Sequence, residues 1–155
     1  MGIKSFQGKR TAVLKKETEP ILVSDYMTKN LITFSKNQSL EDVIATLVAN
    51  RISGGPVVNE NNELIGIISE GDCIKHISES RYYNLPVDKD NTVERAMATE
   101  VETIDGNMNI FDAANQFLKS KRRRFPILEN GKLIGQISQK DILKAALKMK
   151  GNSWK

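Results

Sequence analysis

An internal repeat constrains the fold of this chain more than any single motif in it. A shift of seventy positions aligns identical residues along the first part of the repeat. One residue is then lost in a loop, and a shift of sixty-nine continues the match. The identities include Met27 with Met97, Pro56 with Pro126, Gly66 with Gly135, Ser69 with Ser138, and Asp72 with Asp141. Because self-similarity at a fixed period is typical of duplicated units, we expect two copies of one structural unit.

The repeat predicts the boundaries of the parts of the chain. The two units are expected at residues 24–78 and 94–148, joined by a polar linker at 79–93. A basic arm of residues 1–23 precedes the first unit, and a tail of residues 149–155 follows the second. A unit of about 55 residues is only marginally stable alone. The two units are therefore expected to pack on each other, with clefts between them.

Each unit has the same predicted order of elements: strand, helix, strand, strand, helix. The first strand corresponds to residues 31–34 and, in the copy, 101–104. Apolar residues at i, i+3, i+4, i+7 and i+8 then predict one face of a helix. They are Leu40, Val43, Ile44, Leu47 and Val48, and in the copy Ile110, Ala113, Ala114, Phe117 and Leu118. Two strands follow around a turn, which Asn130-Gly131 marks in the second unit. The predicted fold class is α/β, with two β-α-β-β-α repeats related by a pseudo-twofold axis.

The net charge of +4 comes from the N-terminus and not from the repeat units. Residues 1–16 carry five basic side chains and no acid, so the remaining residues have a net charge of −1. Nucleic-acid binding usually requires a basic face on the fold itself, so nucleic acid is an unfavoured partner. Residues 1–20 show no hydrophobic period, and we expect them to be dispensable for folding.

Residue counts argue against catalysis and against a membrane or secreted setting. No apolar run approaches the roughly 20 residues that span a bilayer, and the N-terminus lacks the apolar stretch of a signal peptide. Cys73 is the single cysteine and His76 the single histidine. They leave no internal disulfide, a poor metal site and no basis for a Ser-His-Asp or Cys-His arrangement. We expect a cytoplasmic protein that is not an enzyme and binds no metal.

A Ser-x-x-Asp element recurs where a predicted strand enters the second helix of each unit, as Ser69 with Asp72 and as Ser138 with Asp141. Two interpretations are open. The pattern is that of a helix capping box, which needs no ligand. The other interpretation comes from a resemblance to a known protein family.

The repeated segments resemble the CBS domain family, which is named after cystathionine β-synthase. The resemblance covers residues 24–148 and rests on G-I-I-S-E-G-D at 66–72 and its copy G-Q-I-S-Q-K-D at 135–141. The strands S-G-G-P-V-V and R-R-F-P-I-L and the openings M-T-K-N-L-I-T and M-A-T-E-V-E-T add to it. It implies a tandem CBS pair that binds adenosine ligands and forms homodimers through its helices. Apolar side chains of the last helix are expected in that interface: Ile142, Leu143, Ala146 and Leu147.

The resemblance also implies two clefts of unequal composition. In the family, the Ser-x-x-Asp element binds the ribose and phosphate of an adenosine ligand, since a helix N-terminus attracts phosphate and a carboxylate accepts the hydroxyls of a ribose diol. Each cleft takes the serine and aspartate of one repeat, the side chains just before the strand proline, and an adenine wall from the other repeat. The primary cleft is predicted to contain Arg123, Arg124, Ser138 and Asp141, with Ile32 and Ile52 as the wall. The secondary cleft would contain Ser53, Gly54, Ser69 and Asp72, with Glu102 and Arg122 as the wall. Arginine suits phosphate through its fork geometry and permanent charge, so phosphorylated ligands are expected first in the primary cleft.

The predicted function is regulatory binding of an AMP-, ADP- or ATP-like ligand by an energy or metabolite sensor. It requires no cofactor and would act on a regulated protein target. Two alternatives stay open at this point: a structural homodimer whose clefts are vestigial, and a nucleic-acid accessory protein that uses the basic arm.

Overall fold

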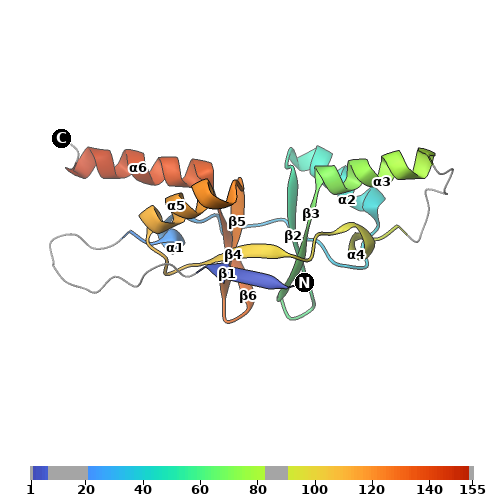
Figure 1. The fold of residues 1–155 in the computed structure, drawn as a ribbon, viewed down its shortest axis with the longest axis horizontal. Helices are drawn as coiled ribbons and strands as arrows, with labels where there is room; N and C mark the ends of the chain where they lie inside the picture. Colours follow the sequence, from blue (N-terminus) through green and yellow to red (C-terminus); the bar gives the residue numbers. More distant parts are fainter. Residues whose placement is uncertain (1, 7–20, 83–90, 154–155) are drawn as a thin grey trace. The chain divides into compact units, whose positions relative to one another are not determined.

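The computed structural model describes residues 2–6, 21–82 and 91–153, so most of the basic arm, part of the linker and the end of the tail lie outside the described residues. The chain forms two compact units, the first with residues 1–3 and 32–101 and the second with residues 4–31 and 102–155. Both units combine helices with β-strands, which confirms the α/β class (Figure 1). Within the described ranges, every helix is too short or too polar to cross a membrane.

The second unit is built on a four-stranded sheet in the order β1-β4-β5-β6. Its strands are β1 (Ile3–Phe6), β4 (Val101–Asp105), β5 (Arg124–Glu129) and β6 (Lys132–Ser138). β4 runs parallel to β5, and β5 pairs with β6 in an antiparallel hairpin. The hairpin turn holds Asn130 and Gly131 at positive φ, as the Asn-Gly pair predicts. Three helices accompany the sheet: α1 (Val23–Tyr26), α5 (Ile110–Ser120) and α6 (Gln139–Ser153).

The core of the second unit includes the apolar face of α5 and the inner residues of the sheet. Ile110, Ala113 and Phe117 are buried, and the Phe117 ring lies 4.8 Å from the ring of the fully buried Phe125. Leu118, the last apolar position predicted for this face, is 77% exposed. A helix turns by about 100° per residue, which places position i+8 at the border of the buried face.

The first unit repeats this arrangement around a two-stranded sheet. Its elements are α2 (Leu40–Asn50), β2 (Gly54–Val58), β3 (Leu64–Ser69), α3 (Glu70–Tyr82) and α4 (Val93–Ala96). Three residues of α2 are buried, Leu40, Val43 and Leu47, whereas Val48 is 73% exposed at the position equivalent to Leu118. The two helices therefore bury the same face, which is narrower than the sequence pattern predicts.

The opening segment of each repeat packs in the unit that holds the rest of the other repeat. In the second unit, Val23 of α1 is fully buried and Thr28 exchanges two backbone hydrogen bonds with Gln136 of β6. In the first unit, Val93 of α4 is fully buried and Ala98 exchanges two backbone hydrogen bonds with Ile67 of β3. The sequence patterns predict neither of these short helices. The boundaries of the repeats stay a prediction.

The N-terminal arm contains a strand that the sequence patterns do not predict. β1 lies beside β4, where the hydroxyl of the buried Thr103 donates to the carbonyl oxygen of Lys4 at 3.2 Å. Phe6 contacts Phe125 edge to face, with 6.5 Å between the ring centroids. Phe6 therefore packs against the core of the second unit, and the expectation that residues 1–20 are dispensable for folding stays a prediction.

The first strand predicted for the first repeat, at residues 31–34, is reduced to a single bridge. Phe34 pairs in parallel with Val57. Its counterpart β4 is a full strand with a neighbour on each side, β1 and β5. Among the described residues, segment 31–34 has no strand that corresponds to β1, which accounts for the shorter element.

Candidate functional site

Each unit contains a junction at which a strand passes directly into a helix. β6 ends at Ser138 where α6 begins, and β3 ends at Ser69 where α3 begins (Figure 1). We name them the Ser138 junction, made of Arg123, Arg124, Ser138, Gln139 and Asp141, and the Ser69 junction, made of Ser53, Gly54, Ser69, Glu70 and Asp72. At this point each helix has the N–H groups that lack a partner within the helix, and the positive end of its dipole.

The serine and aspartate of the Ser138 junction form a reciprocal cap. Asp141 Oδ2 accepts hydrogen bonds from Ser138 N at 2.8 Å and from Ser138 Oγ at 3.0 Å. Asp141 N in turn donates to Ser138 Oγ at 3.3 Å. The cap fixes the carboxylate of Asp141, a residue that is only 8% exposed. The capping interpretation is therefore confirmed. Because the cap uses Oδ2 of Asp141, a ligand hydroxyl could bond to Oδ1 of the same side chain without breaking the cap.

The pairing of β5 with β6 places two arginines beside this cap. Arg124 lies opposite Ser138 in the strand register, and Gln139 N donates to the carbonyl oxygen of Arg123 at 3.2 Å. The Arg123 side chain is exposed and that of Arg124 is half-buried. The pairing therefore brings the backbones of both arginines beside a capped helix N-terminus and its carboxylate.

The Ser69 junction has the same cap but different neighbours. Asp72 Oδ2 accepts from Ser69 N at 2.9 Å and from Ser69 Oγ at 3.0 Å, and Asp72 N donates to Ser69 Oγ at 3.4 Å. Gly54 lies opposite Ser69, and Glu70 N donates to the carbonyl oxygen of Ser53 at 2.9 Å. The sequence thus places glycine and serine where the other junction has arginines.

The residues predicted as adenine walls do not lie in the units of the caps that they would serve. Ile32 and Ile52 belong to the first unit, where Ile52 packs against the core. Glu102 belongs to the second unit, where its carboxylate accepts a hydrogen bond from Arg122 Nε at 2.9 Å. The roles of these residues as walls stay predictions.

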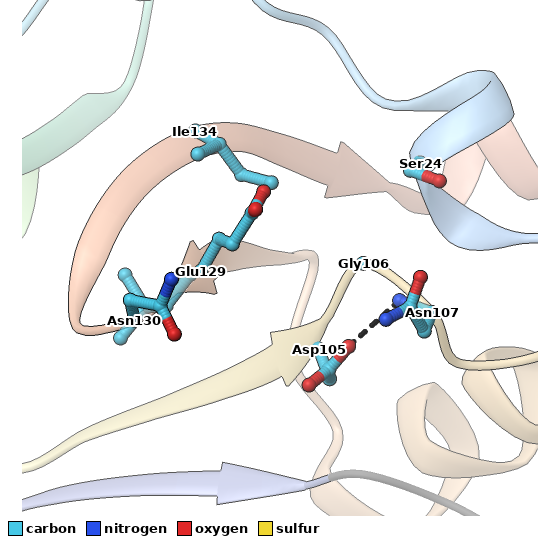
Figure 2. A pocket seen from close by; sticks show the side chains of 8 residues that line it. Ser24, Asp105, Gly106, Asn107, Glu129, Asn130 and Ile134 are labelled. Atoms are coloured by element: carbon cyan, nitrogen blue, oxygen red, sulfur yellow. Dashed lines mark hydrogen bonds between the residues drawn. The ribbon is translucent and has the colours of Figure 1, made fainter. Parts of the chain in front are cut away.

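A cavity of about 370 Å³ lies in the second unit near the turn of the β5–β6 hairpin (Figure 2). The Ser138 junction lies at the opposite end of this hairpin. Its lining is Ser24, Asp105, Gly106, Asn107, Leu128, Glu129, Asn130 and Ile134. Asp105 Oδ1 accepts a hydrogen bond from Asn107 N at 2.7 Å, which occupies part of the polar lining. The sequence patterns give no sign of this cavity because its lining comes from three separate segments.

The single cysteine and the single histidine have structural surroundings. Cys73 is buried. Burial raises the pKa of the Cys73 thiol, and the carboxylates of Asp72 and Glu70 raise it further. His76 Nε2 lies 3.4 Å from Ser80 Oγ. Across the part of the chain that the structure describes, no three His, Cys, Asp or Glu side chains gather into a metal site.

Two archaeal relatives and one family model match most of this chain. The family model described as CBS domain matches residues 23–79 and 83–148. MJ1426 from Methanocaldococcus jannaschii is 30% identical over 83% of this chain and 93% of that protein. MJ1225 from the same organism is 26% identical over 85% of this chain, which spans only 44% of that protein.

A plant relative is similar in both sequence and structure. The chloroplastic CBS domain-containing protein CBSX2 from Arabidopsis thaliana is 29% identical over 83% of this chain and 64% of that protein. The crystal structure of CBSX2 in complex with AMP has a TM-score of 0.73 to this chain, at 29% identity, and the match covers 83% of this chain and 98% of the crystallised one. A second crystal structure of CBSX2 gives a TM-score of 0.75 at 28% identity and covers 87% of this chain and 100% of the crystallised one.

Proposed function

Because this chain belongs to the CBS domain family, we propose that it is a regulatory module that binds an adenosine ligand and catalyses no reaction. The observation that carries the proposal is the Ser138 junction, where two arginines, a capped helix N-terminus and a nearly buried carboxylate are neighbours. The crystal structure of the relative CBSX2 with AMP supports this class of ligand.

The Ser138 junction suits the phosphate and the ribose of such a ligand. The N-terminus of α6 offers the positive end of its dipole to phosphate, while the N–H groups of Gln139 and Asp141 already donate within the protein. Arg124, opposite Ser138, and the neighbouring Arg123 can add charge-assisted hydrogen bonds to it. Asp141 holds the cap through Oδ2 and keeps Oδ1 for a ribose hydroxyl. The preferred ligand at this junction is AMP-, ADP- or ATP-like, with Ile32 and Ile52 proposed as the adenine wall.

The Ser69 junction is proposed as a second site with a lower affinity for phosphorylated ligands. Ser53 and Gly54 stand where the other junction has its arginines, and Glu102 is proposed for its adenine wall. Ligand occupancy of the two sites would be the metabolic signal that a regulated protein target reads. A cytoplasmic location stays a prediction.

Calorimetric titration of the purified full chain with AMP and with adenosine tests the proposal. Asp141→Asn keeps an oxygen for the cap but removes the negative charge, so both ligands should weaken by about ten-fold, because both carry the ribose diol. Asp72→Asn makes the same chemical change in the other cap and is the matched control. It should leave the tightest binding event unchanged. The proposal fails if the wild-type chain binds none of AMP, ADP, ATP and adenosine.

We also propose that two copies of the chain associate through exposed apolar side chains on their helices. In α6, Leu143 is 65% and Leu147 is 70% exposed, and α3 exposes Ile74 and Ile77. Exposed apolar side chains that lie together on one helix are typical of an interface. A structural homodimer without ligand is the second candidate function, and this surface is what favours it.

The nucleic-acid alternative depends mainly on residues 7–20, which lie outside the described residues.

A further inference from the structure

The cavity at the hairpin turn of the second unit has no role in the proposed binding of adenosine ligands. It lies between α1, the end of β4 with the loop after it, and the β5–β6 hairpin. Figure 2 shows Asp105 and Asn107 on one side, and Glu129 and Asn130 of the hairpin on the other. Its volume of about 370 Å³ falls within the range of small-molecule sites, ~300–1,000 Å³. Because the junction at Ser138 lies at the other end of the hairpin, the cavity is a separate candidate site.

The lining of the cavity carries negative charge. Among the described residues that line it are two carboxylates, Asp105 and Glu129, and no basic side chain. Asp105 Oδ1 accepts a hydrogen bond from Asn107 N at 2.7 Å, so Oδ2 of the same carboxylate is the oxygen left for a ligand. Lys132 lies opposite Glu129 in the strand register but outside the lining. A positively charged ligand is therefore attracted to this cavity and an anionic one is repelled.

The backbone at the cavity recurs in the first unit with a different residue. Ser24 N donates to the carbonyl oxygen of Gly106 at 2.9 Å, and at the equivalent place in the repeat Glu94 N donates to the carbonyl oxygen of Lys36 at 3.0 Å. The same backbone bond therefore holds both positions. The first unit has a lysine there, with an ammonium group of its own, and the second unit has a glycine.

Gly106 leaves open a space that a side chain would enter. A Cβ at Gly106 would lie 3.5 Å from Ser24 Cβ and 3.6 Å from Ile134 Cδ1, and both residues line the cavity. The nearest atom, Ile127 Cγ2 at 3.4 Å, is also at an ordinary contact distance. Gly106 is not among the described glycines with positive φ, so its backbone accepts other residues. A lysine at this position would begin between two walls of the cavity, whereas glycine leaves the space and both carboxylates to a ligand.

We propose that this cavity binds an aliphatic diamine. Its two ammonium groups bond to the carboxylates of Asp105 and Glu129, and charge-assisted hydrogen bonds of this kind are stronger than neutral ones. Its methylene chain lies along the apolar side chains of Leu128 and Ile134, as the stem of a lysine does on a protein surface. A metal ion suits the cavity less well, because the described residues include no group of three His, Cys, Asp or Glu side chains.

Titration of the ¹⁵N-labelled full chain with putrescine, a four-carbon diamine, tests this inference at low salt. The amide signals of Gly106 and Asn107 report the cavity, and that of Ser138 reports the junction at the other end of the hairpin. Putrescine at millimolar concentration should shift the signals of Gly106 and Asn107 and leave that of Ser138 in place. Butanediol has the same length without charge and should shift none of them. Butylamine has a single ammonium group and should bind about three- to ten-fold more weakly than putrescine.

Three variants identify the groups that hold the diamine. Asp105→Asn keeps an oxygen for the bond from Asn107 but removes the charge, and Glu129→Gln removes the other charge. Each should weaken putrescine by about three- to ten-fold, and salt should reduce the difference. Gly106→Lys introduces the residue of the first unit and should abolish binding, with a melting temperature close to that of the wild type. Asp112→Asn is the matched control, since it removes a carboxylate of the same unit outside the lining, and it should leave the affinity unchanged.

Several results would overturn the inference. Putrescine might shift neither cavity signal, or butanediol or butylamine might bind as tightly as putrescine. Asp105→Asn and Glu129→Gln might both leave its affinity unchanged, or magnesium ions might shift the same signals at a lower concentration than putrescine does. The proposed function is tested separately by AMP at the signal of Ser138. A failure of either test therefore leaves the other conclusion standing.

Discussion

Arg124 and Gly54 occupy equivalent places, each opposite the serine of its junction, and they account for much of the chemical difference between the two sites. Arg124→Ala should weaken AMP by about ten-fold or more, because a hydrogen bond to a charged group contributes ~1.5–3 kcal/mol. Adenosine should be unaffected because it has no phosphate. Calorimetry with the two ligands measures this split. Arg122→Ala is the matched control, since Arg122 pairs with Glu102. Equal losses for both ligands would contradict a phosphate contact.

Gly135 permits the close approach of an opening segment to β6. A Cβ at this position would lie 2.7 Å from Met27 Sδ and 2.9 Å from the carbonyl oxygen of Thr28. Gly135→Ala should therefore lower the free energy of unfolding by about 1–3 kcal/mol, as overpacking usually does. Urea denaturation measures the loss.

Gly71→Ala is the control for this substitution. A Cβ at Gly71 would have Ser69 Oγ at 3.7 Å as its nearest neighbour, and alanine is favoured over glycine inside a helix by about 0.5–1 kcal/mol. This variant should be neutral or more stable. If the two alanine variants were equally stable, the close approach at Gly135 would not exist.

At the level of residues, the sequence predicts contacts that depend on local spacing. Ser138 and Asp141 are three residues apart, and a helix start brings such a pair together wherever it occurs. The position of Arg124 beside Ser138 follows from the hairpin, which the Asn-Gly turn predicts. Glu102 and Arg122 are twenty residues apart, and no pattern in the sequence links the two positions. Their ion pair depends on tertiary structure that the repeat does not describe.

At the level of elements, long segments are predictable and short ones are not. α2 and α5 have 11 residues each, enough for the apolar spacing to repeat over three turns. β1, α1 and α4 have four residues each, shorter than any period could reveal. Tertiary contacts hold these short elements in place, such as the bond from Val23 N to the carbonyl of Met108 at 2.9 Å. The same reasoning explains why β1 could not be predicted within the arm.

β1 should contribute measurably to stability. Phe6 is half-buried and packs edge to face on Phe125. Truncation of a buried phenylalanine costs about 3–5 kcal/mol, so Phe6→Ala should cost about half of this. The melting temperature would then fall by about 4–8 °C for a chain of this length, as calorimetric melting would show. Lys4→Ala is the control, because the exposed side chain is lost while the carbonyl bonded to Thr103 stays. An unchanged melting temperature for Phe6→Ala would instead support the prediction that the arm is dispensable for folding.

At the level of the whole molecule, the repeat predicts the two units and their α/β content but not the exchange of opening segments. An alignment of the repeats shows which segments are equivalent, and it does not show which segments touch. Met27 aligns with Met97, yet Met27 packs against Gly135 and Met97 packs against Gly66. Each unit therefore needs a segment from the other repeat to complete its core. A single repeat expressed alone would lack that segment.

The exposed apolar side chains of α6 lead to a prediction about assembly. Leu143 and Leu147 are four residues apart and lie one above the other on the helix surface. If they contact a second copy, Leu143→Glu with Leu147→Glu should convert a dimer into a monomer, because it would bury charges without partners in the interface. Sedimentation velocity at micromolar concentration measures this change. Lys144→Glu with Lys148→Glu is the matched control, since it alters the charge of the same helix more strongly but leaves both leucines in place. A wild-type chain that sediments as a monomer at this concentration would rule out the proposed association.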